Sequence, residues 1–246
     1  MLLIRKLLLM LFLVLAVSMI SGCIRETHDD NRTSINPVQQ NGKIVELSFS
    51  KVSNNQQLHE LSSFDMTTVV KKESVSGGTV YIYSNKNDPE HVYGAYETLI
   101  GKYDLGIVGG LYQQMDESLL SIEEVTLNGK LLLCIKGVFG ANAPIQNYFS
   151  QESGIVSLYL RIDTGHASIV DLDGDGNSEI VSSHGTPMRV FLYKIDKNEI
   201  LMVNLNEALN AEDVFLEDTG IFRAANIDTS VIEKYKYQSG KLILQK

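Results

Sequence analysis

Short segments in which apolar and polar residues alternate follow one another from Lys43 almost to the C-terminus. The first of them, IVELSFSKV at residues 44–52, has the period of a strand that is buried on one face. Glycine-containing turns separate such segments, and Asn128-Gly129 lies between two extended runs, a strong signal for a β-hairpin. The pattern predicts an all-β fold made of consecutive antiparallel hairpins. Only Leu205–Glu212, and a segment near Gln57–Phe64, are read as short helices.

Two hairpins resemble each other at a distance of 45 residues. The first, EEVTLNGKLLLCIKGVFG, aligns with SIVDLDGDGNSEIVSSHG, so that Asn128 and Gly129 fall on Asp173 and Gly174. A period near ~45 residues suits the four-stranded blade of a propeller. Because any two β-hairpins look alike, blade-like repeats, which need not form a complete propeller, and a β-sandwich both remain open.

The N-terminus has the composition of a secretory signal. Arg5 and Lys6 precede an apolar run from Leu7 to Ile20, which has 14 residues. This run is shorter than the ~20 residues that a membrane-spanning helix needs, and it suits the apolar region of a signal peptide.

The next residues, Ile20-Ser21-Gly22-Cys23, resemble the bacterial lipobox. The resemblance implies that the signal is residues 1–22 and that the thiol of Cys23 carries lipid. Two or more acyl chains give stable anchoring, so we expect a membrane-anchored protein on the extracytoplasmic face. The alternatives are a plain secretory signal with a chance cysteine, or a short membrane anchor.

Behind the predicted signal peptide, the rest of the chain divides into two parts. Residues 23–42 are polar and aperiodic, which predicts a flexible tether, and residues 43–246 form the all-β domain. With Cys23 lipidated, Cys134 has no cysteine partner, and its apolar neighbours in KLLLCIKG predict a buried thiol.

Charge narrows the class of partner. The chain has 21 lysines and arginines against 30 aspartates and glutamates, a formal net charge of −9. Nucleic-acid-binding domains carry a basic excess, so we expect no nucleic-acid partner. The acidic excess suits cation binding, but simple solubility is the plainer explanation.

The densest acidic cluster is DLDGDGNSE at residues 171–179. In a regular strand, three carboxylates at alternate positions would lie on one face and repel one another. Gly174 and Gly176 allow the chain to curl, so that the carboxylates converge. Several hard oxygen donors suit Ca²⁺, which takes six to eight oxygen ligands. The predicted ligands are the side chains of Asp171, Asp173, Asp175 and Glu179 and the backbone carbonyl of Asn177. An acidic turn without a metal is the alternative.

The same nine residues resemble the calcium loop of the FG-GAP and VCBS repeats of integrin-α-like β-propellers. They also resemble the first half of an EF-hand, but position 12 of that motif is Ser182 and the flanking segments are extended, which favours the β-repeat. The resemblance implies a Ca²⁺ ion that stiffens a loop between strands. That family has several such loops in one propeller, whereas this chain has one.

Catalytic motifs are missing from the sequence. It contains no G-x-S-x-G elbow, P-loop or C-x-x-C pair, so no catalytic residue is assigned. His166 and His184 are the histidines nearest to the acidic loop and could line a site beside it.

Three functions are left. The first is a membrane-anchored, calcium-stabilised binding module with a protein or carbohydrate ligand of the envelope. The others are an accessory structural lipoprotein without a ligand and a calcium-dependent hydrolase.

Overall fold

The structure is a computed structural model, which describes residues 43–52, 56–61, 66, 68–110, 117–140, 143–226 and 231–245. The predicted signal peptide, Cys23 and the predicted tether lie outside the described residues. Residues 41–246 form a unit of their own, whose described apolar clusters draw only on residues of that unit. The unit has a hydrophobic core of its own, as an independently folding domain does.

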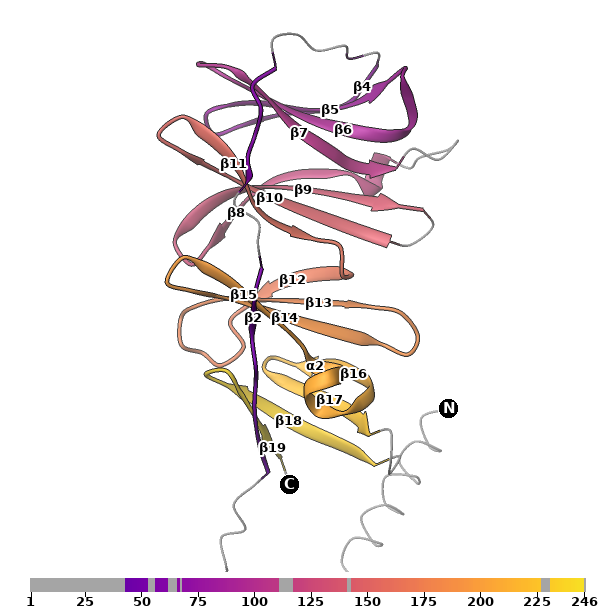
Figure 1. Ribbon diagram of the computed structural model, residues 1–246, viewed down its shortest axis with the longest axis vertical. Helices are drawn as coiled ribbons and strands as arrows, with labels where there is room; N and C mark the ends of the chain where they lie inside the picture. The colour runs from indigo at the N-terminus through magenta and orange to yellow at the C-terminus, as the bar shows by residue number, and fades with distance from the viewer. Residues whose placement is uncertain are drawn as a thin grey trace, which may run out of the picture. The chain divides into compact units, whose positions relative to one another are not determined.

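Sixteen strands form four antiparallel meanders of four strands each, numbered here as the first to the fourth sheet (Figure 1). The first sheet contains β4 (Thr68–Val75), β5 (Gly78–Asn85), β6 (Asp88–Thr98) and β7 (Lys102–Gly110). The second contains β8 (Ser121–Leu127), β9 (Lys130–Phe139), β10 (Ala143–Glu152) and β11 (Ile155–Ile162).

The third sheet contains β12 (His166–Val170), β13 (Glu179–His184), β14 (Arg189–Asp196) and β15 (Glu199–Asn204). The fourth contains β16 (Ala211–Asp218), β17 (Ile221–Asn226), β18 (Ile232–Gln238) and β19 (Lys241–Leu244). The prediction of an all-β fold of consecutive antiparallel hairpins is confirmed. The second, third and fourth sheets begin 45 residues apart, which is the spacing of the two aligned hairpins.

One N-terminal segment pairs with all four sheets. Its strands β1 (Ile44–Glu46), β2 (Ser50–Lys51) and β3 (Gln56–Gln57) add antiparallel to β19, β15 and β11, and Glu60 bridges to Tyr103 in β7. We call the described residues of this segment, 44–52 and 56–60, the strap; it is the indigo trace that passes the sheets in Figure 1. The helix expected near Gln57–Phe64 is wrong where the structure describes it, because residues 56–60 take hydrogen-bond partners from sheet edges.

Three apolar clusters hold successive sheets face to face. One joins the first and second sheets through residues such as Val80 and Ile135, and another joins the second and third through Leu160 and Tyr193. The last joins the third and fourth, with Leu192 as one member. No such cluster of the described residues joins the first sheet to the fourth, so the array does not close into a ring. Each neighbouring pair packs as the two layers of a β-sandwich do.

Burial on both faces explains the continuous apolar run of β9. Leu133 and Ile135 face the first sheet, whereas Leu132 and Cys134 face the third. A strand covered on both faces has no polar side to alternate with. Cys134 is the buried free thiol that the sequence predicted, and burial raises its pKa to about 12.

The short helix α2 (Leu205–Leu209) connects the third sheet to the fourth. The side chain of Asn204 caps its N-terminus by accepting from the backbone N–H of Asn206 at 3.0 Å. The predicted helix extended to Glu212, but Asn210 adopts a left-handed conformation (φ 49°) that ends the helix and lets β16 begin.

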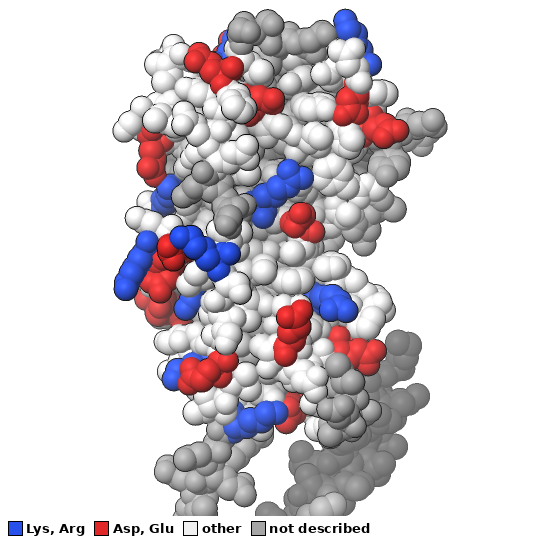
Figure 2. Space-filling view, viewed as in Figure 1, with Lys and Arg blue, Asp and Glu red and all other residues white. Residues whose placement is uncertain are grey.

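Charged side chains of both signs are interspersed on the face of the molecule shown in Figure 2. Several form cross-strand pairs, including Lys51 with Glu199 and Lys234 with Glu217. Such exposed pairs contribute about 0–1 kcal/mol each, so the sheets are held together by their apolar faces.

Backbones of neighbouring sheets approach closely at two glycines. A Cβ atom at Gly137 in β9 would lie 2.0 Å from the carbonyl oxygen of Val108 in β7. At Gly220, between β16 and β17, it would lie 2.0 Å from the carbonyl oxygen of Leu172. Side chains at these positions would force the sheets apart.

We therefore expect Gly137→Ala to destabilise the unit of residues 41–246. Overpacking costs about 1–3 kcal/mol, which for this size corresponds to a melting temperature lower by about 2–12 °C. Differential scanning calorimetry measures the change, and Arg161→Ala, an exposed position of the same sheet, is the control. An unchanged melting temperature for Gly137→Ala would show that the two backbones can separate at little cost.

Candidate metal centre

The acidic cluster forms the loop between β12 and β13 of the third sheet. Gly174 and Gly176 have positive φ angles of 77° and 88°, which only glycine adopts readily. Asp171 accepts the N–H groups of both, at 2.8 Å through Oδ1 and at 3.0 Å through Oδ2. The loop thus curls around Asp171, as the two glycines predicted.

Three of the predicted ligands meet. Carboxylate oxygens of Asp171, Asp173 and Glu179 all lie within 4.8 Å of one another. Asp171 follows Val170, the last residue of β12, which pairs with Glu179, the first residue of β13. The ladder therefore holds Asp171 close to Glu179, while the curl brings Asp173 back toward both.

Glu179 is the buried member of the cluster, with 6% of its surface exposed. Its Oε2 accepts from the backbone N–H of Leu172 at 3.1 Å. Burial, and then the negative charges of Asp173, Asp175 and Asp171, raise its pKa to about 7, although the Leu172 hydrogen bond opposes this. A carboxyl with this pKa is partly protonated near neutral pH, and a bound cation would oppose the shift by stabilising the charged carboxylate.

Asp173 connects the loop to the fourth sheet. Its Oδ2 accepts from the backbone N–H of Ser239, in the turn between β18 and β19, at 2.6 Å. Its Oδ1 is buried and has no hydrogen-bond partner among the described residues. An unpartnered buried carboxylate oxygen is costly unless a ligand binds it. Nearby, burial and the charges of Glu179, Asp173 and Asp175 raise the pKa of the Tyr237 hydroxyl above its ordinary value.

Asn128 connects the loop to the second sheet. Its Oδ1 accepts from the backbone N–H of Ser178 at 2.6 Å, and its Nδ2 donates to the Ser178 carbonyl at 3.2 Å. Asn128 is the residue that the 45-residue alignment places opposite Asp173, but the sequence marked it only as a turn residue. Nothing in the sequence predicts the contact of Ser239 with Asp173, because it joins residues 66 positions apart.

The other two predicted ligands lie at the side of the cluster. Asp175 is exposed, and its Oδ1 accepts from the N–H of Asn177 at 2.7 Å. Both residues line a cavity of about 230 Å³, which Asp173 and Glu179 also line, together with Lys194, Asp196 and Tyr237.

The two histidines do not reach this cavity. His166 begins β12 and His184 ends β13, so both lie at the opposite end of these strands from the loop. The ring of His184 stacks on Phe191, and its Nδ1 is 2.6 Å from the carbonyl oxygen of Thr164. The expectation that they line a site beside the acidic loop is therefore wrong.

The raised pKa of Glu179 gives the metal-free unit a pH-dependent stability. Between about pH 4.5, the ordinary pKa of glutamate, and about pH 7, the folded state binds more protons than the unfolded state. Its free energy of unfolding therefore falls as the pH rises through this window. We expect Glu179→Gln to remove this fall of the free energy of unfolding with pH. Urea unfolding curves recorded with chelator at pH 5, 6, 7 and 8 measure it. The control is Glu90→Gln, at an exposed glutamate of β6; a wild-type slope in Glu179→Gln would contradict the prediction.

The part of the chain that the structure describes contains no helix that is both long and apolar enough to cross a membrane.

Comparison with known proteins adds no relative: no protein-family model, no curated protein and no solved structure matches this chain.

Proposed function

We propose that residues 43–246 form a membrane-anchored, extracytoplasmic binding module that holds one structural Ca²⁺ ion in the loop of the third sheet. Two observations carry the calcium part: the convergence of Asp171, Asp173 and Glu179, and a buried oxygen of Asp173 without a hydrogen-bond partner among the described residues. Oxygen donors of this kind and number suit a hard divalent cation with irregular geometry.

The ligands of the ion would be the three converging carboxylates, with Asp175 and the Asn177 carbonyl available at the side of the cluster. When bound, the ion supplies positive charge that cancels the repulsion among the carboxylates. Since the loop contacts Asn128 of the second sheet and Ser239 of the fourth, this charge stiffens the junction of three sheets. Asp171 and Asn128 hydrogen-bond to the loop backbone and hold it without an ion.

The anchor rests on the sequence around Cys23, which lies outside the described residues. The acidic excess of the chain and the mixture of charges on the face in Figure 2 support a protein or carbohydrate partner rather than nucleic acid.

A calcium-dependent hydrolase is the second candidate, because a carboxyl with a pKa near 7 beside a cavity suits a general base. Burial and carboxylate repulsion account for the same pKa without catalysis, so the binding module is preferred. The third possibility, an accessory structural lipoprotein, requires that the domain bind no partner.

One prediction from the proposed function concerns calcium. With an affinity of ~10⁻⁴–10⁻³ M, as in extracellular modules, calcium at roughly tenfold above the dissociation constant stabilises the fold by about 1.4 kcal/mol. The melting temperature of residues 41–246 then rises by about 3–6 °C. Magnesium raises it less, because it requires a tight octahedron.

We expect Asp173→Ala to abolish this calcium shift. The control is Asp163→Ala, which keeps the shift, because Asp163 is an exposed residue before β12 that does not line this cavity. An aspartate such as Asp196 does line it and is not suitable. Identical melting curves of the wild type with calcium and with chelator would leave only an acidic turn.

Another prediction from the proposed function concerns the lipid anchor. We expect Cys23→Ala to prevent lipidation in a bacterial host, so that the protein carries no acyl chain and its signal is retained or processed aberrantly. Mass spectrometry of the N-terminal peptide measures the acyl chains. A native N-terminal peptide without acyl chains would contradict membrane anchoring while leaving the calcium prediction intact.

A further inference from the structure

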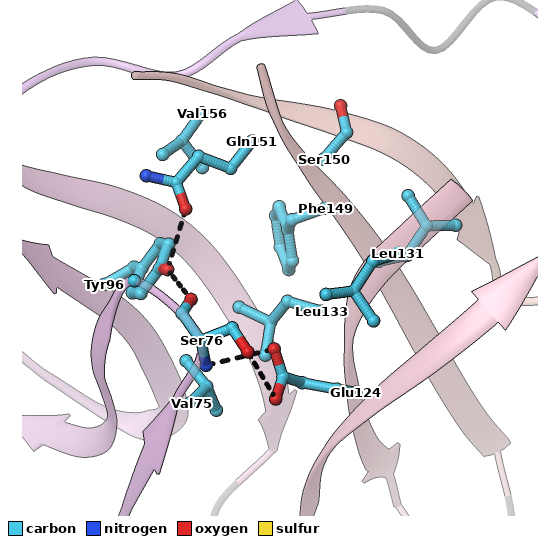
Figure 3. A pocket seen from close by; sticks show the side chains of 12 residues that line it. Val75, Ser76, Tyr96, Glu124, Leu131, Leu133, Phe149, Ser150, Gln151 and Val156 are labelled. Carbon is cyan, nitrogen blue, oxygen red and sulfur yellow. Dashed lines mark hydrogen bonds between the residues drawn. The ribbon is translucent and has the colours of Figure 1, made fainter. Parts of the chain in front are cut away.

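A second cavity, of about 250 Å³, lies between the first and second sheets (Figure 3). One wall is apolar and comes from the second sheet, with Leu131, Leu133, Phe149 and Val156. The polar part of the lining comes from both sheets, with Ser76 and Tyr96 from the first and Glu124 and Gln151 from the second. No residue lines both this cavity and the one at the acidic loop.

The polar part of the lining has hydrogen-bonding capacity that the protein leaves unused. The Tyr96 hydroxyl oxygen is 2.8 Å from the Ser76 carbonyl oxygen and 3.0 Å from Oε1 of Gln151. A phenol has one proton and can donate it to only one acceptor at a time. Oxygen acceptors are therefore available to a donor that enters the cavity.

Glu124 gives the polar part of the lining a negative charge. Its carboxylate accepts from the backbone N–H of Ser76 at 3.0 Å and from the Ser76 hydroxyl at 3.2 Å, both neutral groups. The glutamates at positions 97, 123 and 152 of the same two sheets each pair with a lysine. Glu124 has no lysine, arginine or histidine partner among the described residues, so its charge is complementary to a cation.

Exposed aliphatic side chains continue the apolar surface outside the cavity. Leu131 is 53% exposed on its rim. In the turn between β6 and β7, Leu99 is fully exposed and Ile100 is 65% exposed, and Ile100 packs over Gly154, next to the exposed Ile155. A small molecule within the cavity would leave these side chains in water, whereas a polypeptide would cover them.

We propose that this surface binds an extended segment of another protein, which inserts one large apolar side chain between Leu131 and Phe149 and places a lysine or arginine beside Glu124. An apolar pocket with a polar, charged rim is the usual arrangement around an anchor residue of a protein interface. The proposal rests on the binding role proposed above and gives the chemistry of the ligand. It does not depend on calcium or on lipidation.

The test uses residues 41–246 labelled with ¹⁵N and the probe N-acetyl-phenylalanyl-arginine amide. We expect saturable chemical-shift changes at Ser76, Gly77, Leu131 and Gln151, with a dissociation constant on the order of 1 mM. The same peptide with alanine in place of phenylalanine, and the one with glutamate in place of arginine, bind more weakly. Equal titrations with all three peptides, or no saturable change, would overturn the proposal.

Two variants and a matched control locate the binding. Leu131→Ser weakens it about tenfold by removing apolar contact, and Glu124→Gln weakens it about two- to fivefold by removing an exposed ion pair. Leu119→Ser, at an exposed leucine outside the cavity, leaves it unchanged. Melting curves of each variant show that it is folded; if Glu124→Gln is not, the Leu131→Ser result and the glutamate peptide decide the question.

Lipid is the competing occupant of the exposed aliphatic side chains. Sedimentation with vesicles of phosphatidylcholine and phosphatidylglycerol, with and without the substitutions Leu99→Ser and Ile100→Ser, tests it. Binding that these substitutions abolish would assign the surface to a membrane and overturn the proposal. In every case a calcium shift in the melting temperature is measured in parallel, so that failure at this cavity is distinguished from failure at the acidic loop.

Discussion

The structure depends on the burial of both faces of its two inner sheets. The second and third sheets are covered on either side by another sheet, so their inner strands carry apolar side chains on both faces. At about 25 cal/mol per Å² of apolar surface, this packing is the largest favourable term, and the chain has no described disulfide to add to it. The glycines that let backbones touch, such as Gly137 against Val108, follow from the same requirement.

Stacking of sheets brings loops of successive sheets close together, and the acidic loop lies at such a meeting point. Asn128 from one neighbour and Ser239 from the other hold its backbone and Asp173. Carboxylates that repel one another can stay together because these contacts fix them before any cation arrives. The cavity beside Leu131 also lies at a junction, since residues of the first and second sheets line it.

Local patterns predicted the strand class, the two aligned hairpins and the curl of the acidic loop, because each depends on neighbours in sequence. Val45, Leu47 and Phe49 alternate as expected and all pack against the cluster between the third and fourth sheets. However, residues 44–52 do not form one strand: β1 ends at Glu46 and β2 begins at Ser50, because the segment passes from one sheet to the next. No local signal shows which sheet edge a segment joins. For the same reason the sequence did not predict the contacts of Ser239 or the separation of His166 and His184 from the loop.

The strap also determines how the domain would respond to force. Its pairing with the sheets is short: three residues with β19, two with β15, two with β11 and a single bridge to β7. A pull on the chain from its N-terminal side reaches the pair of β1 and β19 first, and then each following pair in turn. These pairs lie at sheet edges, so they can open one after another while the meander of each sheet stays hydrogen-bonded. The domain could in this way lengthen under tension in small steps before any meander unravels.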